Sequence, residues 1–506
     1  MLKLKEKIKN TNTRYFYFYI LFALCVGILS IMMSYGISGN DFWWHIKSGE
    51  WIVENKAFPR EGIFSWMAMD KHLKWYAHEW LAQVIYYGIY SLGGQLAIYF
   101  FCFFAGVLML YMIYKVTKEY VLNNIMYTVL IFIFTMMIIK NYFYGRPQLF
   151  SYFLIFMELK FLYDYINEKS NKEIFFVPLL GILWVNIHGG SSNLSYLLCL
   201  FFLIAGVINF EFGKISFARL EKNKILTLLG VMVATIVAVF INPYGLDMVL
   251  YPYTNMADNL MLDLIAEWGA PDAKNVAILL FFFVPFALGL ISIITTEKKI
   301  RGIDLLIFAF FSYMFFRSTR FIVMLVISYP FYIFNYIPKF GTLNEVKSKA
   351  DKVVATILIA AGIGMTAFGA VNSVSTYDKG KLIEHELDYK FVKIMKVEKP
   401  KRPYTEYNYG GDLIYYGIEV LVDGRADVYT GTPLEDWNNL TKLTVYSEPN
   451  KKYNKHTFVE DIIKKYNFDA FLVDVNRPLY QYLITNADKY ELVKENKETA
   501  YFRVIN

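Results

Sequence analysis

Cysteine is scarce in this chain: among its 506 residues the only cysteines are Cys25, Cys102 and Cys199. All three lie inside apolar runs, so they are too few and too deeply placed for a disulfide framework or a metal site. The first apolar run is too long for a cleaved signal peptide, and no small-residue cleavage site follows it. Internal repeats and low-complexity tracts are lacking as well. We therefore expect neither a disulfide scaffold, nor a cleaved secretory precursor, nor a repeat protein.

What the chain has in abundance is apolar surface: 56% of its residues are hydrophobic and 19% are aromatic. Many runs approach or exceed the roughly 20 residues that a helix needs to cross a bilayer. The runs are continuous rather than alternating, which indicates helical spans. The fold class predicted is thus an α-helical polytopic membrane protein with about eleven transmembrane helices. The expected spans are residues 14–36, 94–116, 123–140, 148–165, 174–188, 190–209, 225–242, 275–295, 303–316, 320–337 and 353–375.

The distribution of Lys and Arg predicts the orientation of these spans. Basic residues crowd the N-terminus before the first span, and they are denser in the loops that would share its side of the membrane. The positive-inside rule then places the N-terminus in the cytoplasm and the C-terminus outside the cell membrane. We expect a transmembrane domain at 1–375, with a long outer loop at 37–93, and an extracytoplasmic domain at 376–506.

The C-terminal part has the pattern of a small α/β domain. The runs "IEVLVDGRADVY" and "YNFDAFLVDV" are each typical of a short strand, and "KYELVKENKETAYFRVI" is typical of a hairpin. Between them, "TFVEDIIKKY" and "PLYQYLITNADKY" have helical spacing. We therefore expect strands and helices to alternate in this domain.

Unusual polar residues recur at the predicted outer ends of the spans. Ionisable groups are costly at membrane depth, so a one-sided set favours a polar cavity that opens outward. Taken one at a time, each residue is explained better by a place in the wet headgroup zone; the polar cavity is favoured only for the set. The set consists of Asp41, His45, His78, Glu79, Arg146, Asn186, His188, Asn242, Glu267, Arg317 and Arg320.

Asp41 has two interpretations, which are compatible. It stands directly before a helical pattern, "FWWHIKSGEW", where Asp is a common N-cap residue. It could also act as a general base, because a carboxylate with an ordinary pKa of about 4 is ionised at neutral pH. His45 lies one turn further along the helix, so the pair could hold a divalent metal such as Mg or Mn. Two ligands alone do not define a metal site.

The tryptophans of the same helix also have two interpretations. Trp and Tyr are enriched at membrane–water interfaces without any catalytic role, which suits Trp43 and Trp44. The functional alternative is that these rings stack on a sugar or pack on a lipid chain.

Guanidinium groups match phosphate oxygens, so Arg146 and Arg320 are candidates for binding an anion. Arg317 is better explained as ordinary flanking charge. His188 precedes Gly189-Gly190, where the missing side chains permit close approach of a ligand or of another helix.

These motifs together resemble the GT-C superfamily of membrane glycosyltransferases. The resemblance rests on an outward acid after the first span, interfacial helices in a long first outer loop, and an outer C-terminal domain. More closely, the chain resembles a bacterial family of membrane proteins related to that superfamily. The runs that carry this likeness are "DFWWHIKSGEWI", "HEWLAQVIYY", "GRPQLFSY", "WVNIHGG", "NPYG" and "GGDLIYYG…VLVDGRADVY".

The resemblance implies transfer of a sugar from a polyprenyl-phosphate carrier at the outer face of the membrane. Asp41 matches the acid that serves as general base or metal ligand in such enzymes, and Glu79 or Glu267 would be the second acid. Arg146, His188 and Arg320 would hold the carrier phosphate. The sequence departs from the superfamily at Asp41, which has no acidic neighbour.

The remaining expectations concern partners and rival functions. The enzyme would meet a lipid-linked sugar donor, membrane lipid and a glycan, lipid or protein acceptor, and no nucleic acid. A transporter or flippase for lipid-linked glycans is one rival, although it predicts inverted repeats and charges at the membrane midplane, which the sequence lacks. A non-catalytic cell-envelope assembly protein is the other.

Overall fold

The computed structural model divides the chain into two compact units. It describes residues 19–37, 39, 41–121, 125–255, 268–271, 274, 276, 280, 283–337, 349–443, 447–448, 451–452 and 455–505. Unit 1 comprises Met1–Ser38, Ile89–Pro252 and Ile265–Glu384, and unit 2 comprises Gly39–Gly88, Tyr253–Leu264 and His385–Asn506. The last segment of unit 2 begins at His385, and the predicted domain boundary near residue 376 stays a prediction. The first loop, however, belongs with the C-terminal part rather than with the helical part.

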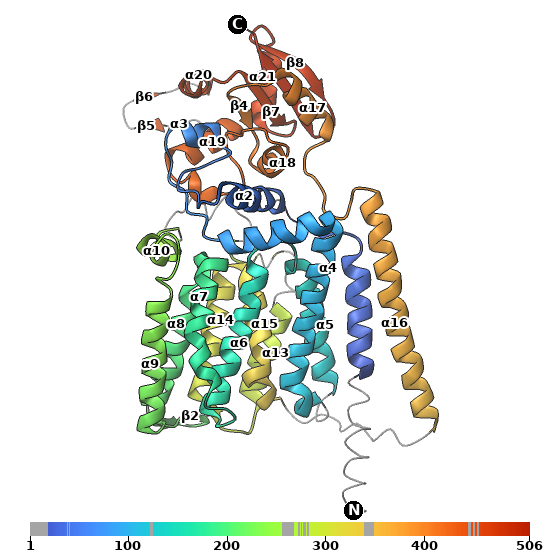
Figure 1. Cartoon of the computed structure of the whole chain (residues 1–506), viewed down its shortest axis with the longest axis vertical. Helices are drawn as coiled ribbons and strands as arrows, with labels where there is room; N and C mark the ends of the chain where they lie inside the picture. Colours follow the sequence, from blue (N-terminus) through green and yellow to red (C-terminus); the bar gives the residue numbers. More distant parts are fainter. Residues whose placement is uncertain are drawn as a thin grey trace, which may run out of the picture. The chain divides into compact units, whose positions relative to one another are not determined.

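Unit 1 is a bundle of apolar helices (Figure 1). It begins with the helix Tyr19–Met33. The others are α4 (Trp80–Val121, which starts in unit 2), α5 (Ile125–Tyr142), α6 (Gln148–Ile166), α7 (Val177–Ile187), α8 (Asn193–Val207), α9 (Lys222–Ala238), α10 (Leu246–Asn255), α13 (Val284–Thr295), α14 (Gly302–Arg317), α15 (Ile322–Tyr332) and α16 (Lys349–Asp378), with the 3-10 turns η1 (Glu173–Phe176), η2 (Gly189–Ser191), η5 (Thr319–Phe321) and η6 (Ile333–Asn335).

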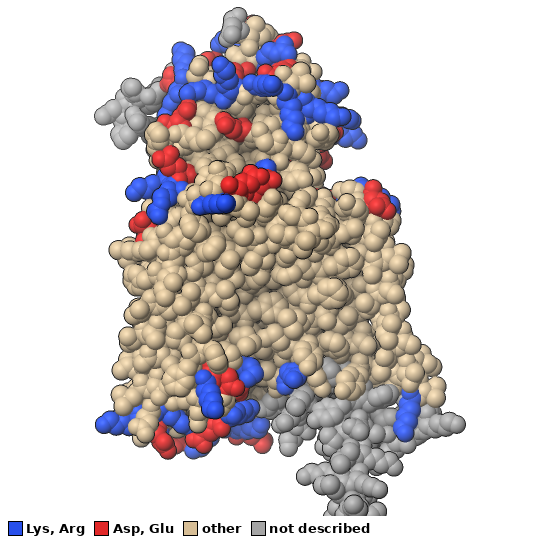
Figure 2. All heavy atoms as spheres, in the orientation of Figure 1, with Lys and Arg blue, Asp and Glu red and all other residues tan. Residues whose placement is uncertain are grey.

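Length and hydropathy suit these helices to a membrane. Within the described residues, Trp80–Thr117, Gly189–Val207 and Lys352–Asp378 are each long and apolar enough to cross a bilayer, and five shorter apolar helices accompany them. Figure 2 shows a broad surface of unit 1 without Lys, Arg, Asp or Glu, bounded by charged side chains. Every predicted span overlaps a helix of this unit, whereas the number of membrane crossings stays a prediction.

The helix Tyr19–Met33 packs closely against α16 through small residues. A methyl group added to Gly362 would lie 2.5 Å from the carbonyl oxygen of Ala23, and one added to Gly27 would lie 2.6 Å from the carbonyl oxygen of Gly362. Such close backbone approach is typical of helix pairs in membranes, where packing rather than the hydrophobic effect holds helices together.

A buried polar cluster marks one end of the bundle. Asp304, in the first turn of α14, accepts hydrogen bonds from the hydroxyls of Tyr163 near the end of α6 (3.0 Å) and Tyr336 after α15 (2.5 Å). Arg301 donates to the same carboxylate, at 2.8 Å from Nε. The sheet of β1 (Phe210–Phe212), β2 (Ile215–Phe217) and β3 (Ile300–Arg301) lies at this end too. The starts of α6 and α15 and the end of α14 therefore lie together at the opposite end.

Unit 2 is built around a four-stranded sheet in the order β4-β7-β9-β8. The parallel pair is β4 with β7, and the two other pairings are antiparallel. Its elements are α2 (Phe42–Asn55), α3 (Trp66–Asp70), α17 (Tyr389–Glu398), β4 (Pro403–Thr405), η7 (Tyr407–Tyr409), α18 (Gly410–Tyr415), η8 (Ala426–Val428), α19 (Thr432–Lys442), β5 (Ser447–Glu448), β6 (Lys451–Lys452), α20 (Lys455–Tyr466), β7 (Ala470–Asp474), α21 (Pro478–Thr485), β8 (Tyr490–Glu495) and β9 (Thr499–Val504).

Most of the predicted elements of this unit are confirmed. The strand in "YNFDAFLVDV" is β7, the hairpin is β8–β9, and the two helical patterns are α20 and α21. The strand predicted in "IEVLVDGRADVY" is wrong. Only Val420 forms a bridge there, because its N–H donates to the carbonyl of Phe64 (3.0 Å) and its carbonyl accepts from the N–H of Trp66 (3.2 Å). The first loop thus supplies the backbone partners that a sheet would otherwise provide.

Candidate functional site

Asp41 stands at the N-cap position of α2, as its sequence context predicts, but its side chain makes no capping hydrogen bond. Its Oδ1 instead accepts a hydrogen bond from the indole N–H of Trp44 at 3.2 Å. A capping carboxylate would accept from a backbone N–H of the first turn. The Asp41 carboxylate therefore does not serve to start the helix.

The turn Asp423-Gly424-Arg425 of the C-terminal part lies directly against Asp41. A methyl group added to Gly424 would overlap Asp41 Oδ1 and would lie 2.8 Å from Nε1 of Trp44. Beside it, the Arg425 guanidinium donates to Asp423 from Nε (2.8 Å) and from Nη2 (2.6 Å). The sequence of this turn favours a structural role, as a strand-ending turn with an ion pair to Asp427, over a ligand site. The ion pair that Arg425 forms is with Asp423 instead.

A row of four ionisable groups runs from α2, through the two residues just before α4, to η8. His45 Nδ1 lies 3.7 Å from Glu79 Oε2, and Glu79 Oε1 lies 3.5 Å from His78 Nε2. His78 Nδ1 in turn lies 3.9 Å from Asp427 Oδ2. Three of these four residues were predicted site residues, whereas Asp427 was not. Its place next to His78 depends on the fold of the C-terminal part and leaves no local sequence signal.

The pKa of His78 is raised above its ordinary value of 6.5. Burial is the largest influence and lowers the pKa, but the nearby carboxylates of Glu79 and Asp427 outweigh it because they stabilise the imidazolium. His78 therefore keeps its proton to a higher pH than an ordinary histidine does.

This shift predicts a pH dependence of stability. A histidine whose pKa is raised by folding contributes stability that is fully present below about pH 6.5 and is lost as the pH rises through the raised pKa. In wild-type protein the free energy of unfolding should therefore fall across this range, and His78→Gln should remove that part of the fall. Thermal unfolding of both proteins between pH 5.5 and 9 in steps of about half a pH unit measures it.

His72 offers a control for this experiment, because its side chain is exposed and pairs with the exposed Glu61. His72→Gln should leave the pH dependence in place. A His78→Gln protein with the pH profile of wild type would contradict the assigned role of the carboxylates.

Trp43 and Trp44 are both buried, with 1% and 5% of their surface exposed. The Trp43 ring stacks on the His385 ring at a centroid distance of 4.1 Å, and His385 Nδ1 lies 2.5 Å from Oδ1 of the buried Asp412. Neither indole has the open face that stacking on a sugar or a membrane belt requires. The two rings instead fasten α2 to the C-terminal part of unit 2.

Five predicted site residues lie in unit 1: Arg146, Asn186, His188, Asn242 and Arg320. They gather at the end of the bundle opposite Asp304. His188 Nδ1 contacts Ser151 Oγ in the first turn of α6 at 2.7 Å, and Ser191 Oγ at 2.8 Å. The Asn186 amide donates to the carbonyl of Ile241, just past the end of α9, at 2.8 Å. These contacts lie at one end of the bundle, and the role of the five residues in binding a ligand stays a prediction.

The side-chain amides of Asn186 and Asn242 stabilise helix ends at this end of the bundle. Asn186 joins two helix ends, and Asn242 orders the turn after α9 by donating to the carbonyls of Val239 (2.9 Å) and Gly245 (3.2 Å) and accepting from the N–H of Tyr244 (2.8 Å). A helix end needs such partners for its free carbonyl groups. We therefore no longer assign either amide to a ligand.

The two arginines stand directly before helix N-termini. Arg146 lies two residues before the start of α6 and over the ring of Tyr144. Arg320, in η5, lies two residues before the start of α15 and over the ring of Trp268, at 4.5 Å. Helix N-termini attract anions, so both positions suit a phosphate. Glu267, the remaining predicted acid, lies outside the described residues.

Solved structures of an archaeal enzyme are similar to the chain over most of its length. They are structures of the oligosaccharyltransferase AglB from Archaeoglobus fulgidus. The apo form has a TM-score of 0.52 at 12% sequence identity and covers 91% of this chain and 70% of that chain. The complex with an inhibitory peptide and a dolichol-phosphate has a TM-score of 0.53 at 12% identity and covers 93% and 71%.

The chain has a GT-C-like fold. The resemblance drawn from the sequence motifs is thereby confirmed at the level of the fold, as is the description of the chain as a mostly helical membrane protein. No protein-family model and no curated protein sequence matches the chain.

The sequence leaves open a metal held by Asp41 and His45, and one AglB structure with the same fold is a complex with Zn and sulfate (TM-score 0.50, 12% identity, 92% of this chain and 69% of that chain). In the part of the chain that the structure describes, no three His, Cys, Asp or Glu side chains are arranged to hold a metal ion. His45 faces Glu79 and Gln83 through its Nδ1. The described donor set thus does not fit the predicted metal, and we assign no step to one.

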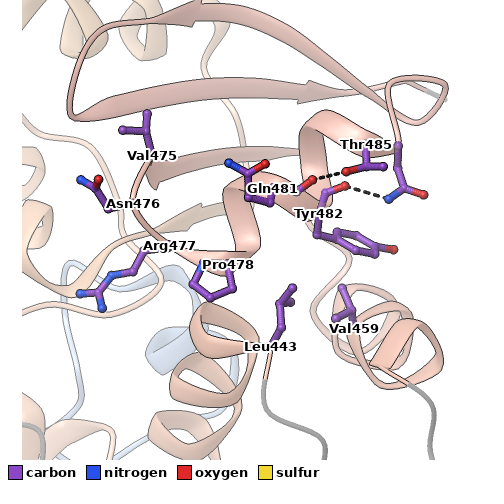
Figure 3. A pocket seen from close by; sticks show the side chains of 10 residues that line it. Leu443, Val459, Val475, Asn476, Arg477, Pro478, Gln481, Tyr482 and Thr485 are labelled. Atoms are coloured by element: carbon purple, nitrogen blue, oxygen red, sulfur yellow. Dashed lines mark hydrogen bonds between the residues drawn. The ribbon is translucent and has the colours of Figure 1, made fainter.

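A hollow of about 770 Å³ lies elsewhere on unit 2, beside α21 (Figure 3). Asn476 and Arg477 lie at one side of it, and Tyr482 and Val459 lie at the other. Its lining shares no residue with the groups around Asp41. Arg477 is the charged residue among the described lining residues, so the hollow suits a neutral or anionic polar molecule.

Proposed function

We propose that this protein is a membrane glycosyltransferase that moves a sugar from a polyprenyl-phosphate-type lipid carrier to an acceptor at the outer face of the cell membrane. The observation that carries the proposal is the position and the hydrogen bonding of the Asp41 carboxylate in a GT-C-like fold. Its carboxylate follows the first helix, makes no capping bond and accepts a hydrogen bond from the indole N–H of Trp44. A carboxylate held in a fixed orientation by such a donor suits a general base.

In this proposal Asp41 orients the acceptor hydroxyl and takes its proton as the bond between the sugar carbon and the carrier oxygen breaks. The acceptor oxygen forms the new bond to the sugar, and the carrier leaves as its phosphate. Glu79 would be the second acid, and the predicted Glu267 stays an alternative to it.

The leaving phosphate gains negative charge, so cations and helix N-termini would stabilise it. Arg146 and Arg320, each before the N-terminus of a helix of unit 1, are the proposed phosphate ligands, and His188 is the third. AglB in one structure binds a dolichol-phosphate, and in another it is tethered to an acceptor peptide containing the NVT sequon. We propose a lipid-linked donor for this chain by analogy, with a glycan, lipid or protein as acceptor.

The proposed donor class predicts a direct result. Purified full-length protein in liposomes should release a radiolabelled sugar from a polyprenyl-phosphate donor into an acceptor-linked product, and it should not use the matching nucleotide sugar. A panel of polyprenyl-phosphate sugars, with extracted cell-envelope glycans as acceptors, measures the transfer by chromatography of the labelled products.

The rival functions give different results in the same vesicles. A flippase would move the labelled lipid between the leaflets and leave its glycosidic bond intact. An assembly protein would do neither. Either outcome, with every donor of the panel left unconsumed, would overturn the proposed transfer.

A further inference from the structure

We infer that the turn Asp423-Gly424-Arg425 positions the Asp41 carboxylate. The C-terminal part of the chain would then complete the site at which Asp41 acts. The inference rests on the proposed function, because it assigns a positioning role for the proposed base. It goes beyond that function by giving the C-terminal part a role in the chemistry. All the residues involved belong to unit 2.

The turn is rigid because its charges are buried and paired. Asp423 and Arg425 are 0% and 1% exposed. The Asp423 carboxylate accepts from the Arg425 backbone N–H at 2.9 Å, and it also accepts from the hydroxyl of Tyr429. The Arg425 guanidinium lies over the ring of Trp75 at 4.5 Å and over that of Phe64 at 5.4 Å. Two aromatic rings of the first loop therefore hold the Arg425 guanidinium in place. Arg425 in turn stabilises the turn through its ion pair with Asp423.

The backbone of the turn is clamped on both sides of Gly424. The hydroxyl of Tyr407 donates to the carbonyl of Gly424 at 3.0 Å. Gly410 lies so close behind Asp423 that a methyl group there would be 2.6 Å from the Asp423 Cα. The turn cannot retreat from α2 without breaking these contacts, so its distance from Asp41 is set by the C-terminal part.

Gly424 is required at the point of contact because no other residue fits there. A Cβ at this position would overlap Asp41 Oδ1 and press on the indole N–H that holds this oxygen. Atoms in a closely packed interior cannot interpenetrate, so either the carboxylate or the turn must move. Since the turn is clamped, the carboxylate is the part that would be displaced. A misplacement of about 1 Å is enough to slow catalysis by about 100-fold.

The test is Gly424→Ala in the full-length protein, assayed for transfer from a polyprenyl-phosphate sugar. We expect kcat to fall by about 10- to 100-fold, with the KM for the donor unchanged within about twofold, because the carboxylate acts on the reacting hydroxyl and not on the carrier. Gly88→Ala is the matched control. A methyl group at Gly88 meets no atom within 4 Å, so this variant should retain the wild-type kcat.

A double variant separates positioning from general damage. If Gly424 acts through Asp41, then Gly424→Ala should cost nothing further in a protein that already carries Asp41→Asn. An additive loss in the double variant, or wild-type kcat in Gly424→Ala, overturns the inference. An active Asp41→Asn protein overturns the proposed base itself, so the two failures are distinct. If Gly424→Ala does not fold, Tyr429→Phe removes the hydroxyl that donates to Asp423 and accepts from Arg425, and it should lower kcat several-fold with the same absence of additivity.

Discussion

Asp41→Asn should lower transfer at least about 100-fold, because general base catalysis typically contributes a factor of 10²–10⁴. The amide keeps the size of the carboxylate, and its oxygen can still accept the indole N–H of Trp44, so the fold of the corner should be retained. What the amide cannot do is take a proton from an acceptor hydroxyl. The measurement is single-turnover transfer from a polyprenyl-phosphate sugar, with binding of the unlabelled donor recorded in parallel.

A second N-cap aspartate of the same unit provides the control. Asp388 caps α17 and accepts a hydrogen bond from the N–H of Lys390 at 2.9 Å. Asp388→Asn should therefore leave transfer unchanged and have only a small effect on stability. If both variants kept full transfer, Asp41 would be no more than the start of a helix. If Asp41→Asn lost donor binding together with turnover, its role would be structural rather than chemical.

Arg425→Ala should destabilise the protein by about 3–5 kcal/mol, the usual cost of removing one partner of a buried ion pair. The substitution leaves the Asp423 carboxylate buried without its bidentate donor and empties the space beneath the rings of Trp75 and Phe64. The free energy of unfolding of the full chain, measured with denaturant in detergent micelles, gives the loss.

Two further variants show whether burial of the ion pair causes the large loss of stability expected for Arg425→Ala. Arg503 pairs with Glu398 and Glu491 on the surface, where an ion pair contributes about 0–1 kcal/mol, so Arg503→Ala should have little effect. Asp423→Asn combined with Arg425→Met removes both buried charges and should recover part of the loss. A destabilisation as small as that of Arg503→Ala would contradict a structural role for the Arg425–Asp423 pair.

The apolar runs were sufficient to place the helices. Each predicted span overlaps a helix of unit 1, because a run of this length and hydropathy has few other ways to satisfy its backbone groups. The pattern of the C-terminal part also placed β7, the β8–β9 hairpin and two helices correctly. It misplaced the strand around Val420, because the partner of Val420 is Phe64, hundreds of positions earlier in the chain. Local periodicity cannot reveal a partner at that distance.

For the candidate site, local sequence identified the residues of α2 and of the start of α4, and it left open whether Asp41 is a cap or a base. The fold narrowed this choice by showing that the carboxylate makes no capping bond and meets Trp44 and Gly424. It also removed Asn186, Asn242, Trp43 and Trp44 from the ligand-binding set, because their polar groups or ring faces are occupied by the protein.

The sequence by itself thus determined that this is a helical membrane protein with a C-terminal α/β part, since hydropathy and period are local properties of the chain. Its motifs supplied the resemblance to the GT-C superfamily. Only the tertiary structure decided that the first loop belongs with the C-terminal part, that Asp427 lies beside His78, and that Gly424 lies against Asp41. These contacts join residues far apart in the sequence. They depend on the packing of two segments whose shapes become complementary only after both have folded.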